Sequence, residues 1–231
     1  MNKKLLHTLS MLLLAMVAFT FTACSLSDLD EMDDLNDHEY VDLGLSVKWA
    51  TCNVGADSPE DYGDYFAWGE TKPKSTYDWS NYKWCQGSRH TITKYCTDSY
   101  FGTVDNKTQL DLSDDAAHVN WGGSWRMPTI DELIELEQKC SWTWTTRNGV
   151  EGYKVISKTN SNSIFLPAAG FRDYSSLYEA SWEGYYWSSS LYADGLEDAS
   201  EDAGCVDVAS GSVDWGYDSR CFGFSVRPVC P

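Results

Sequence analysis

The chain has 231 residues, of which 35 are acidic and 17 are basic, giving a formal net charge of −18. This balance excludes a nucleic-acid-binding protein, because phosphate binding needs a basic patch. Aromatic residues make up 14% of the chain and include 11 tryptophans. Since tyrosine and tryptophan often anchor interfaces, the composition predicts an aromatic-rich core and an aromatic binding surface.

Residues 1–23 have the features of an export signal. Lys3 and Lys4 precede an apolar run that is too short to span a membrane. The letters F-T-A-C at its end resemble the lipobox of bacterial lipoproteins, which implies cleavage before Cys24 and acylation of the Cys24 thiol. An ordinary secretory signal is the alternative.

Residues 24–38 are acidic and contain no lysine or arginine, so we predict a solvated tether. An acidic run behind a lipidated cysteine resembles the surface-export signal of some Gram-negative lipoproteins. The resemblance implies an outer-membrane protein that faces the cell exterior and touches the membrane only through its lipid anchor. A tether that faces the periplasm is the alternative. Residues 39–231 are expected to form one domain.

The densest local pattern lies in residues 121–140. Thr129 and Glu132 fit a T-x-x-E capping box, and apolar residues then recur at helical spacing. We therefore predict a helix that begins after Thr129 and ends near Cys140. A second, shorter helix is predicted after Ser113, which would cap it.

The other patterned segments predict short strands. Residues 40–51 alternate apolar and polar side chains, which predicts one half-buried strand interrupted by Gly44. The Asn148–Gly149 pair separates two alternating runs, as in a β-hairpin. A second hairpin is predicted around Gly211. Residues 71–108 have no sustained period and are predicted as a long loop region. The predicted fold class is α+β, with two main helices, several short antiparallel strands and long loops.

If Cys24 carries the lipid, seven of the eight cysteines remain. In an exported chain these cysteines indicate disulfide bonds, each worth roughly 2–4 kcal/mol. Metal binding is not predicted, since the sequence has no C-x-x-C pair or Cys/His cluster at ligand spacing. The candidate pairs are Cys85–Cys96, Cys205–Cys221 and Cys140–Cys230, with Cys52–Cys140 as a rival pairing.

A set of motifs covers residues 39–231 in order. It comprises V-D-L-G-L-S-V-K-W-A-T-C-N-V-G-A, Y-G-D-Y-F-A-W-G-E-T, N-W-G-G-S-W-R-M-P-T, S-I-F-L-P-A-A-G-F-R, G-Y-Y-W-S-S-S and S-V-R-P-V. Together these motifs resemble the Fibrobacter succinogenes major paralogous domain family. That family is similar in turn to the C-type-lectin-like and formylglycine-generating-enzyme folds, which implies a single C-type-lectin-like domain. The family has no assigned reaction, and a fold does not settle a function.

Two family-related sites are not matched. Lectin-type sugar sites use an E-P-N or Q-P-D loop around calcium, which is absent here, although Asp214-Trp215-Gly216 stands near the place of the W-N-D strand. The paired cysteines of the copper-dependent enzymes have no counterpart that we can assign. We therefore predict no cofactor, no metal ligand and no catalytic residue.

Residues 188–226 have an unusual composition, without Asn, Lys, Thr, Ile, Met, Gln or His. Replacing the adenines of Asn codons yields the residue types that dominate here, which is how diversity-generating retroelements vary the ligand face of lectin-like proteins. We therefore hypothesise a diversified binding face on a scaffold fixed by Trp187 and Arg227. A chance bias toward loop residues is the alternative. The candidate ligand-binding residues are Tyr192, Asp194, Asp198, Asp202, Trp215, Tyr217, Asp218 and Phe222.

The sequence thus predicts a lipid-anchored cell-surface module for ligand binding or adhesion, with an unknown protein or glycan as its partner. Two alternatives remain open. One is an enzyme, related to the formylglycine-generating oxidases or acting as a hydrolase. The other is a structural surface component without a soluble ligand.

Overall fold

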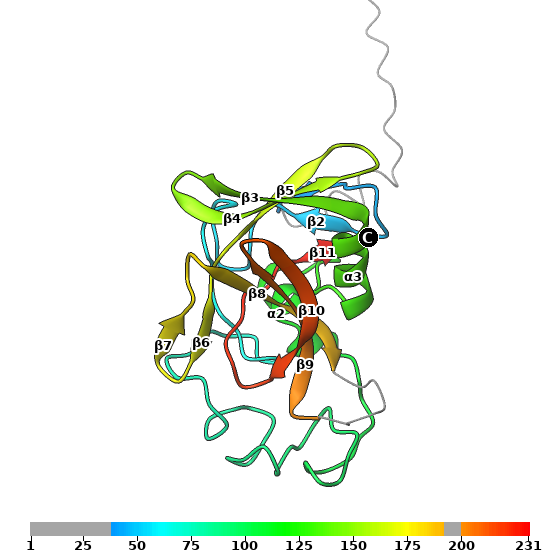
Figure 1. The fold of residues 1–231 in the computed structure, drawn as a ribbon. Helices are drawn as coiled ribbons and strands as arrows, with labels where there is room; N and C mark the ends of the chain where they lie inside the picture. Colours follow the sequence, from blue (N-terminus) through cyan, green and yellow to red (C-terminus); the bar gives the residue numbers. More distant parts are fainter. Residues whose placement is uncertain (1–37, 192–199) are drawn as a thin grey trace, which may run out of the picture.

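The computed structural model describes residues 38–191 and 200–231, which fold into eleven strands, two α-helices and one 3-10 helix (Figure 1). The strands form four small antiparallel sheets. The first contains β1 (Tyr40–Val41), β2 (Lys48–Ala50) and β11 (Val229–Cys230), and the second contains β3 (Cys140–Arg147), β4 (Val150–Ser157) and β5 (Ser163–Pro167). The third contains β6 (Phe171–Asp173) and β7 (Ser176–Tyr178), and the fourth contains β8 (Glu183–Leu191), β9 (Asp202–Ala209) and β10 (Ser212–Ser219).

The main helix, α3 (Ile130–Lys139), begins where the capping box predicts. The Thr129 hydroxyl accepts a hydrogen bond from the Glu132 N–H, and the Glu132 carboxylate accepts one from the Thr129 N–H. The Arg126 guanidinium adds a bidentate contact to the same carboxylate, at 2.6 and 2.8 Å. The start of α3 is thus fixed by three residues that lie within seven positions of each other.

The predicted second helix is short and differently capped. It consists of the 3-10 turn η1 (Leu112–Asp114) followed by α2 (Ala116–Trp121), which has only six residues. The capping side chain is Asp115, which accepts from the His118 N–H at 2.9 Å, and the predicted cap, Ser113, lies inside the 3-10 turn. Gly122, at a φ of 72°, ends the helix.

The predicted α+β class with two main helices is therefore wrong. The described residues contain far more strand than helix, because α2 is only six residues long and because β6 and β7 pair although their local patterns do not reveal it. Residues 40–51 also differ from the prediction: Gly44, at a φ of 68°, lies in the turn that folds β2 back onto β1. The hairpins at Asn148–Gly149 and at Gly211 are confirmed.

Four clusters of buried apolar side chains lie inside the described part of the chain, and two of them are much the largest. One contains the buried rings of Trp68, Trp125, Trp187 and Phe224. The other contains Leu133 and Leu136 of α3, which packs against β3, β8 and β9; Figure 1 shows the helix beside the β8–β10 sheet. The prediction of an aromatic-rich core is confirmed. No helix of the described residues is long and apolar enough to cross a bilayer.

Two buried arginines hold distant segments together. Arg220 is 0% exposed and donates to the Tyr82 hydroxyl and to the carbonyls of Lys94, Tyr95 and Ser200, at 2.7 to 3.1 Å. Arg227 is 1% exposed and donates to the Asn53 side chain and to three carbonyls. Burial lowers the pKa of Arg227 to about 10. Arg220, which follows β10 in the chain, therefore connects the long loop of residues 71–108 to the end of that strand.

All seven cysteines of the described residues are free thiols, so none of the predicted pairs is joined in the structure. Cys140 and Cys230 belong to different apolar clusters, as do Cys205 and Cys221. Cys85 and Cys96 share one cluster, yet each thiol donates to a backbone carbonyl, of Trp79 and of Asp98 respectively. These two thiols therefore find hydrogen-bond acceptors nearby, although their spacing in the sequence suggested a disulfide bond.

Candidate ligand-binding site

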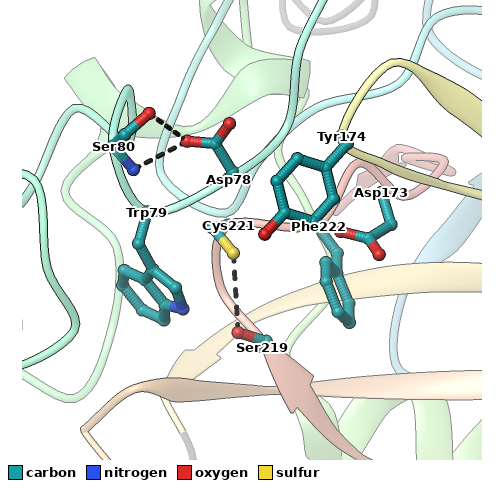
Figure 2. Close-up of a pocket in the computed structure, with 8 residues that line it drawn as sticks. All are labelled: Asp78, Trp79, Ser80, Asp173, Tyr174, Ser219, Cys221 and Phe222. Atoms are coloured by element: carbon teal, nitrogen blue, oxygen red, sulfur yellow. Dashed lines mark hydrogen bonds between the residues drawn. The ribbon is translucent and has the colours of Figure 1, made fainter.

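A cleft of about 430 Å³ opens where three segments meet (Figure 2). The long loop contributes Asp78 and Trp79, the β6–β7 turn contributes Asp173 and Tyr174, and the end of β10 with the turn that follows it contributes Ser219, Cys221 and Phe222. Figure 2 shows the rings of Trp79, Tyr174 and Phe222 around the opening. Such a cleft has the size of a small-ligand pocket, roughly 300–1,000 Å³.

Backbone pairing holds the three segments in register. Tyr77 and Tyr174 exchange hydrogen bonds at 2.8 and 2.9 Å, and Arg172 exchanges two with Gly223 at the same distances. A β-carbon on Gly223 would come within 2.6 Å of Cε1 of Tyr77. Because the absence of a side chain at Gly223 allows this close approach, the three walls of the cleft form one connected unit.

The three rings differ in how firmly they are held. Trp79 is partly buried and meets Tyr82 edge-on, with ring centroids 5.3 Å apart, and Phe222 lies 5.8 Å from Phe171. Tyr174 is 63% exposed and lies in the tight β6–β7 turn at a φ of 49°. Two rings are therefore fixed by packing, while the third stands at the mouth of the cleft.

Carboxylates give the cleft a negative charge. Burial raises the pKa of Asp218, the neighbouring Asp173 carboxylate raises it further, and the Ser219 N–H opposes both. Hydrogen bonds from the Ser80 hydroxyl lower the pKa of Asp78. Among the described residues that line the cleft, none is basic.

The thiol in the cleft is not set up as a nucleophile. Cys221 is 3% exposed, and burial raises its pKa to about 12. The Ser219 hydroxyl lies 3.6 Å from the Cys221 sulfur, the contact drawn in Figure 2. Since the thiolate is the reactive form, this thiol is inert near neutral pH.

The structure separates the predicted ligand-binding residues into groups. Phe222 lines the cleft, and Asp218 precedes the lining residue Ser219 and is repelled by the lining carboxylate of Asp173. Trp215 and Tyr217 are 53% and 50% exposed, but they point to the opposite face of the sheet. Their partners on β9 are Val206, buried against α3, and Gly204, at which a β-carbon would meet Ile130 of α3. Tyr192, Asp194 and Asp198 lie outside the described residues.

The sheet face that carries Asp218 is strongly acidic. Burial raises the pKa of Asp207, and the carboxylates of Asp214 and Glu183 raise it further. The Tyr185 hydroxyl donates to the Glu183 carboxylate. Asp202, at the start of β9, has its pKa raised to about 6 by burial and by its neighbours Glu201 and Asp218. Within the described residues, no group of side chains is arranged to hold a metal ion.

Two walls of the cleft lie outside residues 188–226 and were not predicted from the sequence. Trp79 lies in the segment predicted as a long loop region, and Tyr174 lies in a hairpin turn that carries no Asn-Gly or Gly-X signal. The one available signal was the D-Y-S-S run at Asp173, which is rich in turn residues. Only the long-range pairing of Tyr77 with Tyr174 brings these side chains together.

Comparisons with family models, with curated proteins and with solved structures returned no match. The resemblance carried by the motifs therefore stays a prediction. The class of protein has to be inferred from the geometry of the cleft and of the β9–β10 hairpin.

Proposed function

We propose that the chain is a ligand-binding module whose contact site is the cleft between the long loop, the β6–β7 turn and the end of β10. The observation that carries the proposal is the ring arrangement. Three aromatic side chains from three separate segments surround one opening, on a backbone that is hydrogen-bonded across all three. Rigid aromatic rings supply contact area at a low cost in conformational entropy.

Part of this site belongs to the segment predicted as a diversified face. Positions such as Asp214 and Trp215 are exposed and can change without disturbing the core, whereas Arg220, Phe224 and Ser225 are completely buried. Diversification would therefore be restricted to exposed positions of the segment. A genome search should find an adenine-rich template copy and a reverse transcriptase gene nearby, and their absence would remove this part of the proposal.

The proposed location is the outer face of the outer membrane, with a lipid on Cys24 and residues 24–38 as the tether. These residues lie outside the described part of the chain, so the support is the sequence pattern alone. Protease treatment of intact cells tests the location. Digestion of the domain supports an exterior position, and full protection contradicts it.

A glycan and protein array probed with the purified protein tests the function. Trp79→Ala and Tyr174→Ala should each weaken the strongest array signal about tenfold or more, because one aromatic contact is worth about 1.4 kcal/mol or above. Trp182→Ala is the matched control, since Trp182 is 73% exposed and does not line the cleft.

In the same array experiment, two variants on the β9–β10 hairpin show which face of the sheet binds the ligand. Asp218→Ala should weaken binding, and Tyr217→Ala should leave it unchanged, because Tyr217 lies on the other face of the sheet. If Tyr217→Ala abolishes the signal and Tyr174→Ala does not, the site lies beside α3. If the protein binds no array member, a structural surface component becomes the better explanation.

A further inference from the structure

We infer that the group bound in the cleft is an organic cation, an ammonium or guanidinium carried on a hydrocarbon stem. The inference rests on the proposed function and names the chemistry of its ligand. It follows from two independent features of the cleft, which are its aromatic walls and the unpaired carboxylates beside them.

The first feature is the aromatic wall. The rings of Trp79, Tyr174 and Phe222 line one opening (Figure 2). The face of an aromatic ring is negative, so it attracts a cation within about 6 Å of its centroid. The hydrocarbon stem of such a ligand would also pack against the rings. This contact is favourable because it removes apolar surface from water.

The second feature is a set of carboxylates without counter-ions. Asp78, Asp173 and Asp218 form no ion pair within the described residues. The repulsion between Asp173 and Asp218 contributes to the raised pKa of Asp218. A bound cation would neutralise this repulsion, whereas a neutral ligand would leave it in place.

The basic side chains nearest to the cleft are already engaged. The Lys74 ammonium lies 3.0 Å from the Glu70 carboxylate and 2.9 Å from the Asn81 side-chain oxygen. The Arg172 guanidinium stacks over the Tyr65 ring, 5.0 Å from its centroid. The Lys74 charge still lowers the pKa of Asp78, but Lys74 forms its ion pair with Glu70, so Asp78, Asp173 and Asp218 remain available to a cationic ligand.

The net negative charge of the chain also favours a cationic ligand. At a formal charge of −18, the protein attracts cations before contact is made. The acidic side chains of Asp207, Asp214 and Glu183 lie on the sheet face that leads to the cleft. The same field would repel acidic ligands such as sialylated or sulfated glycans.

Titration calorimetry of the full chain with choline tests the inference, with 3,3-dimethylbutan-1-ol as the neutral isostere. We expect choline to bind at least about tenfold more tightly than the isostere. N-acetyl-lysine methylamide and N-acetyl-norleucine methylamide form a second pair, which tests whether the cation can be a protein side chain. Preference for the charged member of either pair supports the inference.

Two variants, each of which removes one negative charge, distinguish direct contact with the ligand from long-range electrostatic attraction. Asp173→Asn should weaken choline binding about fivefold or more, whereas Asp214→Asn, outside the cleft, should change it less than twofold. Tyr174→Ala should also weaken it. Thermal melting of each variant checks that the fold is retained.

The failures are distinguishable. Equal affinity for the charged and neutral members of both pairs overturns the cation assignment, as does the absence of any binding by all four probes. In either case the proposed function survives if array binding still depends on Tyr174. Array binding that is insensitive to Trp79→Ala and Tyr174→Ala overturns the site itself.

Discussion

Asp202 is a single residue whose charge opposes folding. Its pKa is raised to about 6 by burial and by Glu201 and Asp218, whereas an aspartate of an unfolded chain has a pKa of about 3.9. Between about pH 3.9 and pH 6, the Asp202 carboxyl therefore holds its proton more tightly in the folded state than in the unfolded state. The stability of the fold falls as the pH rises through this window, and the full penalty is present above pH 6.

We expect Asp202→Asn to stabilise the protein by about 1–2 kcal/mol at pH 7.5 and by close to zero at about pH 3, which lies below both pKa values. The gain disappears at low pH because the wild-type carboxyl is then protonated in both states. Urea unfolding at the two pH values measures the difference. Glu39→Gln, an exposed control that also removes one charge, should show no such difference. A gain of the same size at both pH values would mean that ionisation of Asp202 is not the cause.

At the scale of single elements, the start of α3 depends on one hydroxyl. The Thr129 side chain accepts from the Glu132 N–H, and the helix then packs against β9. Thr129→Ala removes this acceptor and should destabilise the fold by about 1 kcal/mol. Thr129→Ser keeps the hydroxyl and should remain within a few tenths of a kcal/mol of wild type. Urea denaturation midpoints compare the variants, and equal loss in both would point to the lost methyl group.

Elements whose partners lie close in sequence were predictable. The capping box at Thr129 and the hairpin at Asn148–Gly149 use residues that lie only a few positions apart, so their chemistry is visible in the letters. The second helix was overestimated at its start, because Ser113 stands before two acidic residues as an N-cap would, whereas residues 112–114 form a 3-10 turn and Asp115 is the cap. The pairing of β1 with β2 was missed, because alternation alone does not show where a strand turns back.

The cleft could not be predicted for a different reason. Its walls depend on the pairing of Tyr77 with Tyr174 and of Arg172 with Gly223, which are far apart in the chain. Two candidate residues from segment 188–226, Phe222 and Asp218, do lie in or beside the cleft. They were chosen because the unusual composition of the segment indicated a binding surface, although its geometry was unknown. The same composition could not tell that Trp215 and Tyr217 face away from them, since that depends on strand register.

At the scale of the whole molecule, Arg220 joins the long loop to the C-terminal part of the fold. Its guanidinium binds four acceptors at once and stacks 4.8 Å from the Trp68 ring centroid. A lysine ammonium is a point charge that cannot reach four acceptors in this planar arrangement. Arg220→Lys would leave buried carbonyls of the long loop without a donor, each at a cost of about 1–3 kcal/mol.

We therefore expect Arg220→Lys to expose residues 71–108 to proteolysis. Thermolysin should cut the variant within this segment several times faster than wild type, as mass spectrometry of the early fragments would show. Arg89→Lys is the matched control, because Arg89 is exposed and makes its contacts, to Glu201 and to the His90 ring, at the surface. Equal cleavage rates in all three proteins would show that the loop holds its position without the guanidinium.

The first sheet joins the two ends of the domain, since β2 pairs with β1 on one side and with β11 on the other. During translation, β11 leaves the ribosome long after β2, so this sheet cannot be completed until β11 has emerged. Native contacts of such high sequence separation also form slowly. Until then one edge of β2 has no strand partner, and an unpaired edge is where another chain can add a strand.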